Sequence, residues 1–85
     1  MIIKFSKKAD KDLSNIDKQH IKRIIQKLKD FASGESADVI FLKGYLNLYR
    51  LRVGDYRIIF EFIDGEIRII HVLRIQRRSE VYKDL

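Results

Sequence analysis

The segment that decides the fold is YRLRVGDYRIIFEFI, residues 49–63. On each side of Gly54–Asp55 the side chains alternate between apolar and polar, the pattern of a β-strand with one buried face. Gly-Asp between two such runs is a good signal for a two-residue hairpin turn. We therefore predict antiparallel strands over Asn47–Val53 and Tyr56–Ile63. A two-residue turn also fixes the register, which pairs Val53 with Tyr56, Arg52 with Arg57, Leu51 with Ile58 and Arg50 with Ile59.

A second hairpin is predicted directly after the first. Asp64–Gly65 is a strong two-residue turn signal, and the alternation resumes over Glu66–Ile75. No proline interrupts these strands. The predicted register pairs Ile63 with Glu66, Phe62 with Ile67, Glu61 with Arg68, Phe60 with Ile69, Ile59 with Ile70, Ile58 with His71 and Arg57 with Val72.

Helices are predicted before the hairpins. Ile2–Phe5 is a short β-prone run, and Ser6 after it is a favourable helix N-cap. A first helix is expected to break near Asn15–Asp17, and a second carries an apolar stripe and stops at Gly34. Ile40–Leu42 is an apolar anchor before the sheet. Ala9, Leu13 and Ile16 give the first helix its spacing, and the stripe of the second is Ile21, Ile24, Ile25, Leu28 and Phe31.

The predicted order is β-α-α-β-β-β in one domain, residues 1–85. The fold class is α+β: an N-terminal helical hairpin packs on one face of a small antiparallel sheet.

Composition excludes several kinds of chemistry. The chain of 85 residues has no cysteine, so it has no disulfide, thiol nucleophile or cysteine-rich zinc site. Its two histidines, His20 and His71, are isolated, and we predict neither a metal nor a cofactor. No apolar run is long enough to span a membrane, and no signal peptide is visible. We expect a soluble, cytoplasmic protein whose net charge of +6 suits an acidic partner, such as nucleic acid or an acidic protein.

The two halves of the chain carry different cations. Residues 1–42 hold eight lysines and one arginine, whereas residues 43–85 hold seven arginines and two lysines. Lysine is a hydrated point charge that suits a solvated helix face, while the planar fork of arginine suits two-pronged contact with phosphate or carboxylate. The arginine-rich half is the predicted sheet.

The predicted register divides the sheet into two faces. One face is a core face, against which the helices pack; His71 within it is expected to be a core histidine with a satisfied hydrogen bond. Its members are Tyr49, Leu51, Val53, Tyr56, Ile58, Phe60, Phe62, Ile67, Ile69, His71, Leu73 and Ile75. The opposite face carries Arg50, Arg52, Arg57, Ile59, Glu61, Arg68, Ile70, Val72 and Arg74.

Three arginines on the opposite face form a candidate anion site. Arg52 and Arg57 are predicted to face each other, and like charges there destabilise by a few tenths to about 1 kcal/mol unless an anion binds. Arg50 lies two residues along the same face. An apolar floor is expected beside them, and the tail is expected to return over this face with guanidinium groups and an aromatic ring, an arrangement that suits RNA. The floor residues are Ile59, Ile70 and Val72, and the tail residues are Arg74, Arg77, Arg78 and Tyr82.

The sequence resembles the RelE toxin family of toxin–antitoxin systems, within the RelE/ParE superfamily. The resemblance rests on Leu42–Gly44, on Tyr49–Phe60 and on the closing segment Val72–Tyr82 with its final Glu-Val-Tyr. It implies a toxin that enters the ribosomal A site, cuts mRNA with the 2′-hydroxyl as nucleophile without metal or cofactor, and so inhibits translation. It also implies a cognate antitoxin, with operator DNA bound only through the toxin–antitoxin complex, and no contact with a membrane.

The resemblance also implies roles for individual residues. The implied catalytic residues are Arg50, Arg52, Arg57, Arg78 and Tyr82, with Arg77 the near alternative to Arg78; the expected RNA-binding residues are Lys43, Arg74 and Arg77. This chain departs from the family where some members have lysines at positions 50 and 52, and where many relatives have Gly-His in place of Gln76-Arg77. Arginine is a poor general base, so the proton acceptor stays open and catalysis would depend on Tyr82 and the ribosome.

Two other functions remain open at this point. A ParE-like toxin that inhibits DNA gyrase shares the fold and does not need a phosphate-cleaving cluster. A non-catalytic module would use the basic face only to dock an acidic antitoxin or nucleic acid. The sequence leaves open the codon preference, the antitoxin's identity, the stoichiometry of the complex and whether the toxin is active in its host.

Overall fold

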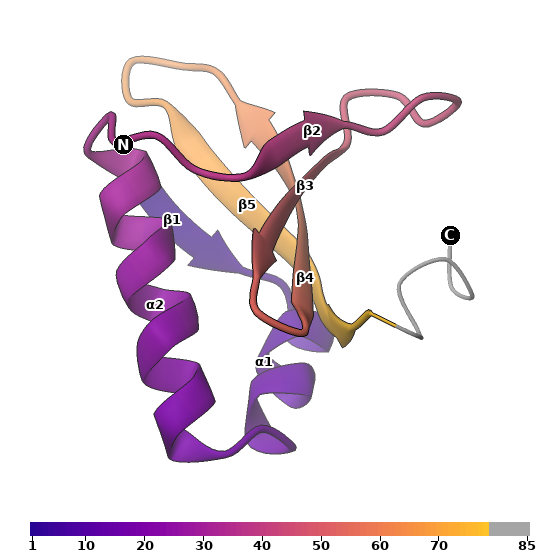
Figure 1. Cartoon of the computed structure of the whole chain (residues 1–85). Helices are drawn as coiled ribbons and strands as arrows, with labels where there is room; N and C mark the ends of the chain where they lie inside the picture. Colours follow the sequence, from indigo (N-terminus) through magenta and orange to yellow (C-terminus); the bar gives the residue numbers. More distant parts are fainter. Residues whose placement is uncertain (79–85) are drawn as a thin grey trace.

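The computed structural model describes residues 1–78, and both of their helices pack on the same face of a five-stranded sheet (Figure 1). This confirms the predicted α+β class. The elements are β1 (Ile2–Phe5), α1 (Lys7–Ser14), α2 (Lys18–Ala32), β2 (Val39–Phe41), β3 (Tyr49–Val53), β4 (Tyr56–Ile63) and β5 (Ile69–Arg77).

The sheet is mixed, which corrects the prediction of an antiparallel sheet. Its strand order is β1-β5-β4-β3-β2, and β1 runs parallel to β5 while the other neighbours are antiparallel. Parallel neighbours need a long connection, and here the chain between β1 and β5 includes both helices and the other three strands. The predicted order lacked one strand: β2, a short edge strand paired with β3, overlaps the apolar anchor that was predicted at Ile40–Leu42.

The helical hairpin forms where it was predicted. The Ser6 side chain accepts a hydrogen bond from the Ala9 amide at 3.0 Å and caps α1. The chain then breaks over residues 15–17 before α2 begins. After α2, Gly34 adopts a left-handed φ of 94°, as expected for a glycine that follows a helix.

The core lies between the helices and the predicted face of β3 and β4. Fully buried side chains from α2 meet fully buried side chains from the sheet, so the alternation read from residues 49–63 is confirmed. The register of this hairpin is also as predicted, from Val53 opposite Tyr56 to Arg50 opposite Ile59. The fully buried core members on these elements include Ile24, Leu28, Leu51, Ile58 and Phe60.

The predicted register of the second hairpin is wrong. Residues 64–68 form a longer loop, so Ile63 faces Ile69 and Glu61 faces His71. As a result Ile70 and Val72 turn into the core instead of away from it. His71 correspondingly leaves the core face: its Nδ1 lies 2.9 Å from Oε2 of Glu61, and its side chain is 28% exposed. Arg68 pairs with Asp64 at 2.9 Å rather than with Glu61.

A β-bulge restores the predicted alternation near the end of β5. Phe60 faces Val72 while the preceding Ile59 faces Arg74, so Leu73 is the extra residue that forms the bulge. The extra residue reverses the alternation a second time. Ile75 therefore lies in the core, where it was predicted.

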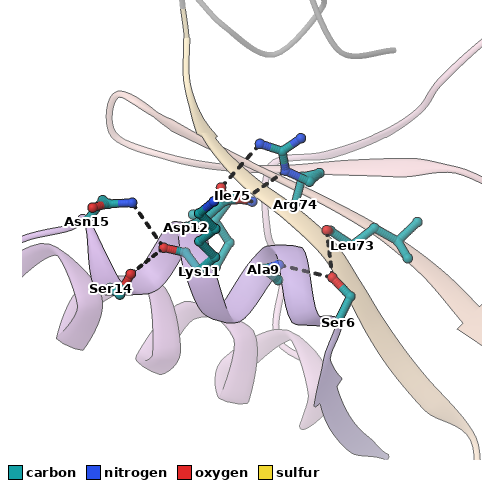
Figure 2. A network of polar contacts seen from close by, with 9 residues as sticks. All are labelled: Ser6, Ala9, Lys11, Asp12, Ser14, Asn15, Leu73, Arg74 and Ile75. Carbon is teal, nitrogen blue, oxygen red and sulfur yellow. Dashed lines mark hydrogen bonds and ion pairs between the residues drawn. The ribbon is translucent and has the colours of Figure 1, made fainter.

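Side chains of α1 and its cap satisfy the backbone at the bulge (Figure 2). The Ser6 hydroxyl donates to the Leu73 carbonyl at 2.8 Å, and the Ile75 amide donates to Oδ2 of Asp12 at 2.8 Å. Asp12 also accepts from Nε and Nη2 of Arg74, at 2.9 and 3.2 Å. Buried backbone groups need such partners, so the bulge and α1 stabilise each other.

The face away from the helices is partly covered by the loop between β2 and β3. Ile59 is fully buried there against Leu42, with Tyr45 and Leu48 around them. The prediction of an exposed apolar floor on this face is therefore wrong. Ile59 is covered by the loop, and Ile70 and Val72 face the helices. Within residues 1–78, neither helix combines the length and apolar character that crossing a membrane requires.

Candidate functional site

The β3–β4 hairpin brings three arginines together. Arg52 and Arg57 are cross-strand partners, and Arg50 lies two residues from Arg52 on the same strand. The two-residue turn at Gly54–Asp55 forces this arrangement, because it fixes which residues face each other. Gly54 adopts a φ of 58°, a left-handed conformation that such a turn uses and that glycine adopts without strain.

The carboxylate of Asp38 joins this group. Asp38 immediately precedes β2, and its carbonyl accepts a hydrogen bond from the Arg52 amide at 2.9 Å. Its Oδ1 lies 3.2 Å from Nη2 of Arg50, and its Oδ2 lies 3.4 Å from Nε of Arg52. One carboxylate therefore contacts two of the three arginines.

The guanidinium of Arg57 is fixed beside the turn. Its Nη1 donates to the carbonyls of Gly54 at 2.8 Å and Tyr56 at 3.1 Å. Arg57 is only 6% exposed, and Gln76, directly opposite on β5, is 4% exposed. Of the five N–H donors of the guanidinium, two are thus used to hold it in place.

The electrostatic environment of Arg57 is strongly positive. Burial lowers the pKa of Arg57 below that of an ordinary arginine. The positive charges of Arg50, Arg52 and Arg78 lower this pKa further. The negative charge of Asp38 acts in the opposite direction and raises it. The region therefore favours an anion, whose charge would offset the repulsion between the arginines.

The end of β5 places Arg78 with this group and Arg77 elsewhere. The Arg78 amide donates to the Asp55 carbonyl at 2.8 Å, which ties the chain to the β3–β4 turn. Arg77 instead faces Tyr56 across the ladder and lines a small pocket with Asp12, beside α1. Of the two closing arginines, the geometry favours Arg78. We call Arg50, Arg52, Arg57 and Arg78 the arginine group.

The arginine group offers guanidinium donors and positive charge to a phosphate. Such groups bind phosphate and stabilise the negative charge that develops when a phosphodiester reacts. Within residues 1–78, no three His, Asp or Glu side chains are grouped so that they could hold a metal ion.

Comparison with known proteins identifies the family. Residues 3–82 match the model of the ParE toxin of the type II toxin–antitoxin system parDE. The chain is 34% identical to Toxin RelE3 of Methanocaldococcus jannaschii, over 96% of both sequences. The chain belongs to the RelE/ParE family of toxins.

Solved structures of other RelE/ParE toxins have the same fold. The toxin resembles a chain of the RelB-RelE antitoxin-toxin complex from Methanococcus jannaschii with a TM-score of 0.72, 31% identity, and coverage of 96% of this chain and 98% of the other. For the archaeal RelE-RelB complex from Pyrococcus horikoshii, the TM-score is 0.69 at 30% identity, covering 92% and 94%. A chain of the RelBE2 complex from Mycobacterium tuberculosis, at 23% identity and a TM-score of 0.60 over 91% and 96%, shares the fold.

Other predicted site residues of the toxin lie apart from the arginine group or outside the described chain. Arg74 lies opposite Ile59, on the predicted side of the sheet, but its guanidinium pairs with Asp12 of α1 instead of joining the arginine group (Figure 2). Lys43 is exposed on the loop after β2. Tyr82 lies outside the described residues. The roles of all three in RNA binding or catalysis stay predictions.

The sequence did not indicate two residues of the candidate site, Asp38 and Gln76. The position of Asp38 follows only from the pairing of β2 with β3. Because Val39 faces Leu51, the preceding Asp38 lies beside Arg52. Gln76 was misplaced because the longer β4–β5 loop shifts the register by three residues and the bulge at Leu73 by one more, which puts Gln76 and not Val72 opposite Arg57.

Proposed function

We propose that this toxin is a ribosome-dependent endoribonuclease that cleaves mRNA in the A site by attack of a 2′-hydroxyl. The observation that carries the proposal is the arginine group, in which a buried Arg57 is held by two backbone carbonyls among three further positive charges. Without a bound anion this concentration of like charge destabilises a small domain. A phosphodiester supplies the missing negative charge.

The proposed reaction needs no metal or cofactor. The 2′-hydroxyl loses its proton, O2′ attacks the neighbouring phosphorus, and the P–O5′ bond breaks as O5′ gains a proton. The products are a 2′,3′-cyclic phosphate, which can open to a 3′ phosphate, and a 5′-hydroxyl. Arg57 and its neighbours hold the phosphate and stabilise the charge on its oxygens. Tyr82 is proposed to stack on a base or to take part in proton transfer.

A cognate antitoxin is the proposed protein partner. The similar chains from Methanococcus jannaschii and Pyrococcus horikoshii are parts of RelB-RelE complexes. The net charge of +6 makes an acidic antitoxin segment a suitable ligand. We propose that operator DNA is bound only by the toxin–antitoxin complex, and that the toxin acts in the cytoplasm.

Inhibition of DNA gyrase is the second candidate function. It is favoured by the family model, whose name is that of ParE. This activity does not need a phosphate-cleaving site, so it leaves the arginine group without a role. For that reason we place it second.

The decisive experiment is cleavage of mRNA on programmed ribosomes by purified toxin. We expect cuts within the A-site codon that leave 5′-hydroxyl ends, and no effect on supercoiling by gyrase in a parallel assay. Arg78→Ala should reduce cleavage about 100-fold, as loss of one group that stabilises transition-state charge does. Arg68→Ala is the matched control, because Arg68 is an exposed arginine of the β4–β5 loop that pairs with Asp64; this variant should cleave normally.

Arg57 needs a subtler substitution than alanine. The sequence predicts that Arg57→Ala leaves the fold intact, but Arg57 is buried and bonded to the turn. Arg57→Lys keeps the positive charge and removes the planar guanidinium group. It should therefore lower cleavage about 100-fold with only a modest loss of stability. A docking module would tolerate this change. Intact mRNA with the wild-type toxin, together with inhibited gyrase, would establish the second candidate instead.

A further inference from the structure

One acidic side chain lies among the arginines, and it comes from a different strand. Asp38 precedes the edge strand β2 and contacts Arg50 through Oδ1 and Arg52 through Oδ2. Its side chain is 49% exposed, so a ligand can reach the carboxylate from solvent.

The backbone holds Asp38 in this position. The Arg52 amide donates to the Asp38 carbonyl at 2.9 Å, and the next residue, Val39, faces Leu51 in the ladder. The carboxylate therefore enters the arginine group at a position set by strand pairing, which is more rigid than a position on an unpaired loop.

The guanidinium of Arg50 depends on Asp38. The Arg50 side chain is only 16% exposed, and its Nε is buried with no hydrogen-bond partner in residues 1–78. Its Nη2 donates to Asp38 at 3.2 Å. Arg50 is thus oriented through the Nη2 end of its fork, while like charges on Arg52 and Arg57 repel it.

We propose that Asp38 is a positioning residue for the toxin's reaction: by bridging Arg50 and Arg52, it holds both guanidinium groups side by side for the substrate phosphate. The inference rests on the proposed nuclease function. Asp38 offsets part of the repulsion within the arginine group, and a phosphate finds two guanidinium groups already aligned. A pre-aligned site binds the transition state without the cost of ordering its side chains at that moment.

This role differs from that of a proton acceptor. Both Asp38 oxygens are directed at guanidinium groups, with Oδ1 at 3.2 Å from Arg50 and Oδ2 at 3.4 Å from Arg52. If Asp38 orients arginines, its removal changes the rate at saturating RNA but leaves the shape of the pH–rate profile unchanged. If it accepts the proton, its removal abolishes a limb of that profile.

The first test measures arginine order and does not depend on cleavage. Nitrogen-15 relaxation of the Arg50 and Arg52 Nε–H groups should report restricted motion in the wild type and increased motion in Asp38→Asn. Asp64→Asn removes a comparable Asp–Arg pair in the β4–β5 loop and should leave both groups restricted. Unchanged order of Arg50 and Arg52 in Asp38→Asn would overturn the proposal.

The second test measures cleavage on programmed ribosomes. We expect Asp38→Asn to lower kcat at least tenfold, with KM unchanged or lower because a negative charge has left the RNA site. Asp38→Glu should recover part of kcat, and Asp64→Asn should behave as the wild type. An unchanged kcat, or loss of a limb of the pH–rate profile, would refute a positioning role. If the wild type cleaves no RNA, the proposed function fails, and the relaxation data alone decide whether Asp38 orders the arginines.

Discussion

The two hairpins of this sheet set their registers by different means. The β3–β4 hairpin turns through Gly54 at a φ of 58°, and the paired residues follow from that turn alone. The β4–β5 hairpin also offers a strong turn sequence, Asp64–Gly65, yet Gly65 does not adopt a left-handed φ. The chain instead makes a longer loop over residues 64–68, closed by the ion pair between Asp64 and Arg68.

Contacts far along the chain explain the difference. At the bulge in β5, Leu73 and Ile75 are bonded by Ser6 and Asp12, residues separated from them by more than sixty positions. These bonds and the parallel pairing with β1 act on β5 but not on the β3–β4 turn. Local turn chemistry therefore determines the first register, and tertiary contacts override it in the second.

Asp12→Ala should have the largest effect, because it breaks the contacts that hold the second register. The Asp12 side chain is 16% exposed, and its loss leaves the Arg74 guanidinium and the Ile75 amide without this acceptor. We expect the free energy of unfolding to fall by about 2–3 kcal/mol. Urea denaturation measures the loss, and hydrogen exchange should show reduced protection of the Ile75 amide.

Asp10→Ala is the matched control for Asp12→Ala. Asp10 lies on the same helix but is exposed, so it should cost no more than about 1 kcal/mol, from its place in the first turn. Equal losses in the two variants would show that the bulge contacts do not set the register.

The same division between local and distant contacts explains which parts of the site could be predicted. Arg52 and Arg57 face each other as expected, because four consecutive turn residues determine that pair. The ion pair of Arg74 could not be predicted, because its partner Asp12 is 62 residues away along the chain. Asp38 was not predicted as a site residue because the neighbouring strand β2 has only three residues, too few to show an alternating pattern.

Two errors in the predicted register of the second hairpin partly cancelled each other. The longer loop moved Ile70 and Val72 into the core, and the bulge at Leu73 then returned Ile75 to its predicted side. A period of two cannot reveal an inserted residue, since each insertion exchanges the two faces. The helices and the strand character of residues 69–75 were therefore predictable, while the faces of residues 69–72, between the loop and the bulge, were not.

Substitutions of the two turn glycines should change the free energy of unfolding by an intermediate amount. Gly54→Ala forces alanine into a left-handed conformation and should cost about 1 kcal/mol in the free energy of unfolding. A clash is not the cause, because the nearest atom to the added methyl would be Nη2 of Arg23 at 3.7 Å. Gly65 does not adopt a left-handed conformation, so Gly65→Ala should change the free energy of unfolding by less than about 0.5 kcal/mol.

Thermal or urea unfolding of the two alanine variants provides the measurement. Gly54→Asn is the rescue variant, since asparagine tolerates the left-handed region better than alanine. A Gly65→Ala loss as large as that of Gly54→Ala would mean that both turns set their registers locally.

The smallest expected effects concern the charges that each hairpin carries, and they differ in sign. Arg52 faces Arg57 with Arg50 beside it, and its only ion pair within residues 1–78, to Asp38, is long at 3.4 Å. Its side chain is 56% exposed, so solvent screens these terms, and Arg52→Gln should stabilise the fold by a few tenths of a kcal/mol.

Arg68→Gln should instead destabilise the fold by up to about 0.5 kcal/mol. Arg68 lies 2.9 Å from Asp64 and places its guanidinium carbon 4.0 Å from the centre of the Phe62 ring. Unfolding in 0.05 M and 0.5 M NaCl distinguishes charge from packing, because added salt should shrink both electrostatic effects and leave the aromatic contact. If Arg52→Gln also destabilises the fold at low salt, the repulsion in the arginine group is already relieved by Asp38, and the group does not need a bound anion for stability.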